Sequence, residues 1–256
     1  MSSPTSTLFS QNEKSLLKSH LLRSNSIAAS ETTTLADAAN TLTNAKAFHI
    51  STLGVPLLGG CFTSSQLTTN IFAADNTIAY TSTRGKYTSG NCTLSTPLTG
   101  DLITTTYRFG PGKPPTLRYV DTPKNADNEE VTLHGQWLAR TQGFVAPSGH
   151  SLEWRYTREL TPETGNKRSI MVLLDLSEGR RIAQLVRTEG TRMEGSNRCS
   201  AGNGGLLLID EEACEKVVDE ALVIASCLVM LKKEVDRRRC MRAFVLSAAI
   251  SAGGSC

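Results

Sequence analysis

Across the middle of the chain, apolar and polar residues alternate over short stretches that are separated by glycine, proline and polar turns. In residues 102–109, one face holds Ile103, Thr105, Tyr107 and Phe109, and the other holds Thr104, Thr106 and Arg108. A period of two is typical of a half-buried strand, and residues 152–157 repeat it. The same criteria predict strands or hairpins over residues 67–73, 77–83, 116–120, 131–134, 137–140, 169–176, 181–187 and 206–209. Residues 169–176 are almost continuously apolar, so both faces of that strand are expected to be covered.

Residues 221–231 break this pattern, because Ser226 is their only polar residue. A helix that is apolar on every side must be surrounded by protein or by lipid. At ~1.5 Å per residue this run covers about 16 Å, roughly half of the ~30 Å needed to cross a bilayer. Protein is therefore the expected environment. With Asp210 as its N-cap, we predict a helix over residues 211–239.

Strands followed by such a helix predict a mainly β (α+β) fold, an antiparallel closed or nearly closed β-barrel around a C-terminal hydrophobic helix. Residues 1–50 are rich in Ser and Thr and are expected to form a disordered arm. Residues 51–66 then serve as a linker or first edge, and residues 67–242 form the barrel with its central helix. The apolar piece in residues 243–256 is either a C-terminal tail or one more strand.

The sequence does not contain a recognisable catalytic or metal-binding pattern. Its seven cysteines include no C-x-x-C pair, and its four histidines are scattered. Because no secretory signal is readable, we expect a reducing compartment, the cytoplasm or nucleus. We therefore expect no cofactor and no metal, and favour a non-enzymatic, monomeric protein.

The 200–205 loop, Ser-Ala-Gly-Asn-Gly-Gly, has the composition of a phosphate-binding loop. Known phosphate loops lead from a strand into a helix, whereas this one leads into a predicted strand. A glycine-rich turn is therefore the favoured interpretation. The aromatic residues Tyr107, Phe109, Trp154 and Tyr156 are candidates for ligand stacking, but core packing is favoured for them.

Several sequence blocks together resemble the tubby C-terminal-like fold group, which comprises tubby proteins, phospholipid scramblases and LURP-one-related proteins. They are 152–156 (LEWRY), 181–187 (RIAQLVR), 200–205 (SAGNGG) and 219–233 (DEALVIASCLVMLKK). They also resemble uncharacterised fungal proteins placed in that group. The resemblance is architectural, covers about residues 60–250, and implies a closed barrel around a central helix. Tubby proteins bind phosphoinositides and scramblases act at membranes, although their basic positions do not align onto this chain.

The net charge of +3 is small, but residues 232–242 hold six basic residues against Glu234 and Asp236. A solvated helix end, an anionic lipid surface and a nucleic acid are three interpretations of this cluster, taken in decreasing order of preference. A second basic set lies on the predicted strands and turns, and gathered into one patch it would bind the phosphates of lipid headgroups. The members of this set are Arg155, Arg158, Lys167, Arg168, Arg180, Arg181 and Arg187.

We therefore expect a binding or scaffold domain that recognises anionic phospholipid headgroups, including phosphoinositides, at a membrane surface. The alternative is a carrier or enzyme for a small hydrophobic ligand in a pocket at the barrel mouth. A helix that fills the barrel leaves little room for such a pocket. A deep pocket beside the helix, lined by Tyr107, Trp154 and a histidine, would favour this alternative. Embedding of residues 221–250 in a membrane is disfavoured by the basic residues that divide the two apolar pieces.

Overall fold

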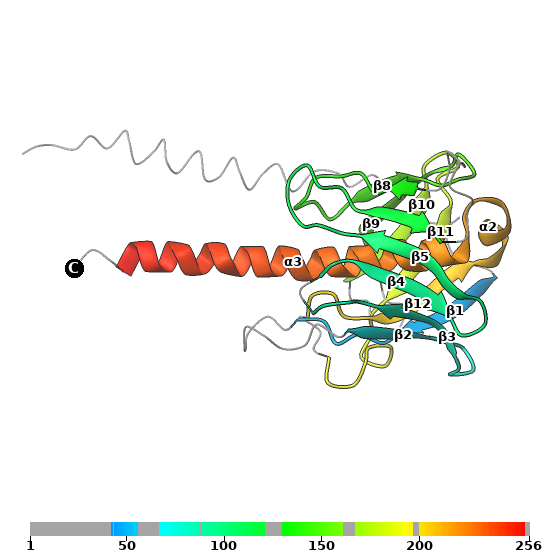
Figure 1. Cartoon of the computed structure of the whole chain (residues 1–256), viewed down its shortest axis with the longest axis horizontal. Coiled ribbons are helices and arrows are strands. Elements are labelled where there is room, and N and C mark those ends of the chain that lie inside the picture. The colour runs from blue at the N-terminus through cyan, green and yellow to red at the C-terminus, as the bar shows by residue number, and fades with distance from the viewer. Residues whose placement is uncertain are drawn as a thin grey trace, which may run out of the picture. The chain divides into compact units, whose positions relative to one another are not determined.

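The computed structural model describes residues 42, 44–55, 67–87, 89–120, 130–160, 167–196 and 200–253. Twelve strands and two helices form the part of the chain described (Figure 1). The strands are β1 (Ala45–Ile50), β2 (Thr68–Ala73), β3 (Ile78–Thr83), β4 (Cys92–Thr96), β5 (Gly100–Thr106), β6 (Thr116–Tyr119), β7 (Glu130–Thr132), β8 (Gln142–Val145), β9 (Ser151–Leu160), β10 (Lys167–Asp175), β11 (Arg181–Val186) and β12 (Gly205–Asp210). The helices are α2 (Glu211–Lys216) and α3 (Glu220–Gly253).

All neighbouring strands pair antiparallel, in the order β7-β6-β5-β4-β3-β2-β1-β12-β11-β10-β9-β8. The two outer members of this order come together just beyond β7. There the backbone N–H of His134 donates to the carbonyl of Gly143, and Gly143 donates back, at 2.7 and 2.8 Å. The sheet is thus a nearly closed antiparallel barrel, and the predicted fold class is confirmed.

Helix α3 runs through the barrel, as Figure 1 shows. Its residues 221–234 are buried against inward-facing side chains of the strands. Ser226, the one polar residue of the apolar run, accepts a hydrogen bond from the indole nitrogen of Trp154 at 2.9 Å and donates to the carbonyl of Val223. Trp154 is fully buried. The core interpretation of this tryptophan is correct, because the helix satisfies its only polar atom.

The prediction that β10 is covered on both faces is also confirmed. Met171 and Leu173 point into the barrel core, whereas Ile170, Val172 and Leu174 form a second buried cluster on the other face. The alternating residues of β5 and β9 that the sequence analysis assigned to the interior are buried or half-buried as well.

Several predicted boundaries need correction. Strand β1 lies inside the predicted disordered arm, where Phe48 and Ile50 enter the core and the backbone pairs with both β2 and β12. Residues 1–41 and 43 lie outside the described residues. Residues 137–140 form a turn, and the strand in this region is β8.

The predicted single helix over 211–239 is two helices, because the chain turns at residues 217–219 between α2 and α3. Asp210 caps α2 as predicted, accepting from the backbone N–H of Ala213 at 3.1 Å. Residues 243–253 are neither a tail nor a strand. They continue α3, since the chain has no glycine or proline between residues 220 and 252 to end the helix.

Strand direction gives the barrel two distinct ends. One end holds α2 and the start of α3, and we call it the α2 end. At the other end α3 leaves the barrel, and we call it the exit end (Figure 1). The alternating connections of the antiparallel sheet place the β2–β3, β4–β5 and β10–β11 turns at the α2 end. They place residues 84–87, 89–91, 107–115, 187–196 and 200–204 at the exit end.

Candidate functional site at the exit of the central helix

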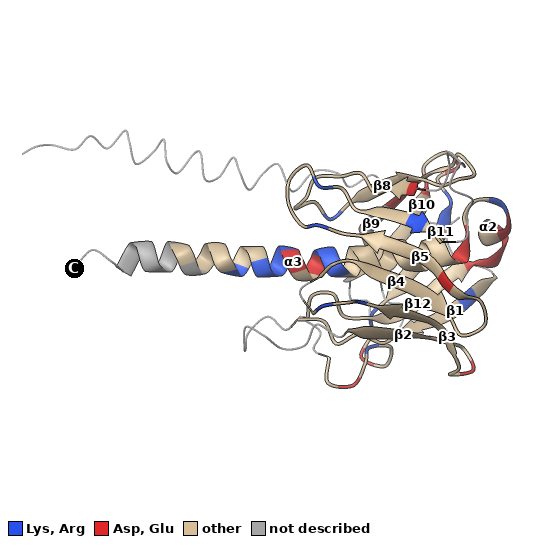
Figure 2. Cartoon of the chain, in the orientation of Figure 1, with Lys and Arg blue, Asp and Glu red and all other residues tan. Residues whose placement is uncertain are grey.

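Charge is distributed unequally between the two ends, as Figure 2 shows for α2 and α3. Acidic residues gather at the α2 end. They are Asp75, Asp101, Asp175, Glu178, Asp210, Glu211, Glu212, Glu215, Asp219 and Glu220. The basic residues at this end, among those described, are Lys46, Arg180, Arg181 and Lys216. Basic residues gather at the exit end, where the acids among the described residues are Glu159, Glu189, Glu194, Glu234 and Asp236. The basic residues there are Arg84, Lys86, Arg108, Lys113, Arg140, Arg158, Arg187, Arg192, Lys232, Lys233, Arg237, Arg238, Arg239 and Arg242. The barrel therefore presents a positive end from which α3 projects.

At the exit end, buried charged residues of α3 replace the apolar ones. Glu234 accepts hydrogen bonds from both terminal nitrogens of Arg187, at 2.9 and 2.8 Å. It also accepts from the Tyr156 hydroxyl and from the backbone N–H of Gly202, the latter at 2.8 Å. Burial alone would raise the pKa of Glu234, but these donors outweigh it and hold the pKa below its ordinary value.

Gly202 explains the composition of the 200–205 loop. Its φ is +71°, and a Cβ there would lie 2.6 Å from the carbonyl oxygen of Leu231 and 2.4 Å from Cγ2 of Val235. Only glycine brings the loop this close to α3. The loop is a turn that leads into β12, as the sequence analysis favoured, and its backbone binds Glu234 of the same chain.

The next turn of α3 carries a second buried pair. The ammonium of Lys232 lies 2.7 and 2.8 Å from the two carboxylate oxygens of Asp236, and it sits 5.7 Å from the centre of the Tyr107 ring. Burial lowers the pKa of Lys232, although Asp236 opposes that shift. This lysine therefore has its counter-ion within the helix.

Lys233 has no such counter-ion. Only 5% of it is exposed, and its ammonium donates to the backbone carbonyl of Gln136 at 3.2 Å. It makes no ion pair with any acid in the described part of the chain. Burial, with a smaller contribution from the nearby Arg237 charge, lowers the pKa of Lys233 to about 8.

A pocket of about 390 Å³ opens beside Lys233. Its walls include Tyr107, Phe109 and Trp137, and the Phe109 and Trp137 rings meet edge to face with centres 5.1 Å apart. His134 also lines it. The pocket has the tyrosine and the histidine that the alternative interpretation required, but its tryptophan is Trp137, since Trp154 lies in the core.

Beyond the barrel, α3 continues as a projecting helix. Residues 237–242 carry four arginines, of which Arg239 lies 3.8 Å from Asp236 and Arg238 reaches the carbonyl of Val55 at 3.5 Å. Residues 243–250 follow with Ser247 as their only polar residue. Met241, Phe244 and Val245 are 55%, 58% and 66% exposed. A basic band is therefore followed by an apolar segment whose Phe244 and Val245 side chains are exposed.

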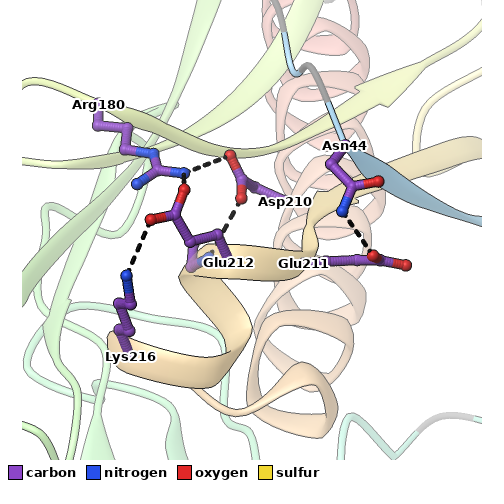
Figure 3. Close-up of polar contacts among 7 residues, drawn as sticks. Asn44, Arg180, Asp210, Glu211, Glu212 and Lys216 are labelled. Carbon is purple, nitrogen blue, oxygen red and sulfur yellow. Dashed lines mark hydrogen bonds and ion pairs between the residues drawn. The ribbon is translucent and has the colours of Figure 1, made fainter.

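The structure does not gather the seven basic residues predicted on the strands and turns into one patch. Arg180 lies at the α2 end, where it bridges Asp210 and Glu212 at 2.9 and 3.0 Å (Figure 3). Arg181 lies at the same end and pairs with Glu159 at 2.6 Å. Arg155 lies mid-strand opposite Val172.

The remaining four members lie towards the exit end. Arg158 is exposed near the end of β9, and the register places Lys167 and Arg168 opposite the same stretch of that strand. Arg187 faces the interior and pairs with Glu234. A period of two in 181–187 puts Arg187 on the face of Ala183 and Leu185, so its inward direction was readable from the sequence.

In the described ranges, His, Cys, Asp and Glu side chains nowhere form a group of three or more that could hold a metal ion. Within the same ranges, the helices lack a segment long and apolar enough to cross a membrane. No protein-family model, curated protein or solved structure matches this chain.

Proposed function

We propose that this protein is a non-enzymatic module that binds anionic membrane surfaces through the projecting end of α3. The observation that carries the proposal is the order of residues on this projection. A band of arginines comes first, and an exposed apolar segment follows it away from the barrel. Such an order matches the order of headgroups and acyl chains in a lipid leaflet.

The dimensions of the projection support insertion into one leaflet. Residues 243–253 span about 16 Å at ~1.5 Å per residue, close to half of the ~30 Å hydrocarbon core. With this segment among the acyl chains, Arg237, Arg238, Arg239 and Arg242 lie at the level of the headgroups. Each basic residue near an anionic surface contributes about 1 kcal/mol.

The charge polarity of the barrel supports the same orientation. An anionic surface attracts the basic exit end and repels the acidic α2 end, so the approaching protein is turned with α3 towards the lipid. Arg158, Lys167 and Arg168 lie on the strand ends that face the surface in this orientation. The proposal thus keeps part of the strand set predicted from the sequence and assigns the larger role to α3. Membership in the tubby C-terminal-like group remains a prediction that is consistent with it.

Vesicle co-sedimentation tests the proposal. We expect the full chain to sediment with phosphatidylcholine vesicles that contain phosphatidylserine or phosphoinositides, and to sediment much less with phosphatidylcholine alone. Replacing Phe244→Asp and Val245→Asp should abolish sedimentation. Val145→Asp is the matched control, because Val145 is 54% exposed but lies at the α2 end.

A second copy of the chain is the other occupant that an exposed apolar helix end would accept. Light scattering without lipid distinguishes the two. A monomer that sediments with anionic vesicles supports the proposal. A stable dimer that dissociates in the Phe244→Asp, Val245→Asp variant and ignores vesicles would overturn it.

A further inference from the structure

The pocket beside Lys233 is built from segments distant in sequence. Residues 107–115, 134–137 and 142 line it, and α3 contributes Lys233. Its volume of about 390 Å³ falls within the range of small-molecule sites. Aromatic and proline side chains form much of its lining, so its interior favours an apolar molecular body.

Two polar side chains converge within this pocket on one backbone oxygen. The ammonium of Lys233 lies 3.2 Å from the carbonyl oxygen of Gln136, and the amide nitrogen of Gln142 lies 3.5 Å from the same atom. Gln142 is only 1% exposed, and its amide oxygen has no hydrogen-bond partner in the described part of the chain.

Gly135 makes this convergence possible. A Cβ at this position would lie 2.2 Å from the amide nitrogen of Gln142, and the φ of Gly135 is +153°. Glycine therefore admits the glutamine side chain to the pocket. The arrangement is a built site, and not a gap left by loose packing.

The ammonium of Lys233 lacks a negatively charged partner among the described residues. Burying an ammonium without a counter-ion is costly, and Lys232, one residue earlier, has Asp236 for that purpose. The other charged or titratable side chains that line the pocket are Tyr107, Arg108, Lys113 and His134, and Arg237 acts on Lys233 from the next turn. Burial and the nearby Asp236 raise the pKa of Tyr107, so its hydroxyl stays neutral. None of these side chains is a carboxylate.

We propose that this pocket binds a small organic carboxylate with an apolar body, whose carboxylate pairs with the ammonium of Lys233. The apolar part lies against Phe109, Trp137 and the neighbouring prolines. The ligand carboxylate provides the counter-ion that Lys233 lacks among the described residues. The aromatic walls exclude water from this ion pair, and a lower local dielectric strengthens the pair. This site is separate from the projecting end of α3, for which membrane contact is proposed above.

Decanoate and 1-decanol are suitable probes, because they share the apolar chain and differ in the carboxylate. Trp137 supplies the readout as a change in fluorescence on titration. The only other tryptophan, Trp154, is buried in the core and serves as a constant background. We expect decanoate to bind at least about tenfold more tightly than 1-decanol at pH 7, as a charge-assisted pair predicts.

Lys233→Met should bring the decanoate affinity down to that of 1-decanol and leave 1-decanol binding unchanged. Lys216→Met, at an exposed lysine of the α2 end, is the control and should change neither. In the native chain, decanoate affinity should fall as pH rises above the Lys233 pKa, because the neutral amine no longer pairs with a carboxylate. That pH profile tests the idea even where Lys233→Met does not fold.

Equal affinities for the two probes, or a decanoate affinity that does not depend on Lys233 or pH, would overturn the proposal. The Phe244→Asp, Val245→Asp variant should keep full decanoate binding while losing vesicle binding. Lys233→Met should do the reverse. Failure of one proposal is therefore distinguishable from failure of the other.

Discussion

The carboxylate of Glu234 and the guanidinium of Arg187 form a two-bonded ion pair where α3 leaves the barrel. Arg187 directly follows β11, and Glu234 lies three residues beyond the apolar run of the helix. The pair therefore joins the wall of the barrel to the helix α3 that the barrel encloses. It also fixes the point from which the basic band and the apolar end project.

Removing one partner of this pair should be strongly destabilising, because the other is left as an uncompensated buried charge. We expect Arg187→Met or Glu234→Met to lower the free energy of unfolding by about 3–5 kcal/mol each. The double variant should lose clearly less than the sum. Urea unfolding measures all three, with Lys216→Met as an exposed control that changes stability by less than about 1 kcal/mol. Additive single losses would contradict the pairing.

The Glu234 carboxylate should make the free energy of unfolding depend on pH in the acidic range. Because the folded-state pKa of Glu234 is held below its ordinary value of 4.5, its contribution is complete above that value. It is lost as pH falls through the lower folded-state pKa. The native chain should therefore lose stability below about pH 4.5 more steeply than Glu234→Met. Parallel pH profiles of the two proteins would show that the pair does not control this loss.

Gly202→Ala should destabilise the barrel more than the same change elsewhere. Gly179 is the matched control, since its φ of +66° is close to the +71° of Gly202 but nothing lies within 4 Å of a Cβ there. Gly179→Ala carries only the cost of the left-handed backbone, about 1–2 kcal/mol. Gly202→Ala adds a collision with the backbone of α3, so we expect a total loss above roughly 3 kcal/mol. Equal midpoints in urea unfolding would contradict a close contact between loop and helix.

The proposed membrane contact should be sensitive to salt, because its headgroup component is electrostatic. The screening length falls from about 30 Å at 0.01 M salt to about 8 Å at 0.15 M. Sedimentation with anionic vesicles should weaken over this range and persist in part, since insertion of the apolar end does not depend on salt. Replacing Arg237→Gln and Arg242→Gln together should reduce the salt dependence. Binding that is unaffected by salt would indicate that the apolar end acts without the basic band.

The barrel and its central helix were predictable because their patterns are local. Period-two alternation in β5 and β9 reflects one buried face, and the run from Ala221 to Leu231 reflects burial on all sides. Strand β1 was missed because residues 1–50 were judged by their average composition, which is dominated by the Ser- and Thr-rich stretch before the six residues of the strand. Within them, the buried Phe48 and Ile50 already alternate with the small or polar Ala47 and His49.

The projecting end of α3 shows a limit of pattern reasoning. Residues 243–250 are as apolar as a core segment, and apolarity alone indicates burial. The exposure of Phe244 and Val245 becomes evident only once the barrel is known to end near Glu234. The pocket beside Lys233 had no sequence signature, because its lining comes from separate segments that only the closed sheet brings together.

Lys233 should limit the stability of the protein at neutral pH, as an unpaired buried charge would. Its pKa falls from 10.5 when unfolded to about 8 when folded, so the unfolded chain holds more protons between these values. The free energy of unfolding contributed by this group therefore rises as pH rises from about 8 to 10.5. Lys233→Met removes the cost of burying the ammonium and should be more stable than the native chain at pH 7. Its advantage should shrink as pH rises from about 8 to 10.5, and thermal unfolding of both proteins across this range measures the difference. A variant that is less stable at pH 7, or a difference that does not change with pH, would show that the ammonium has a partner that satisfies it.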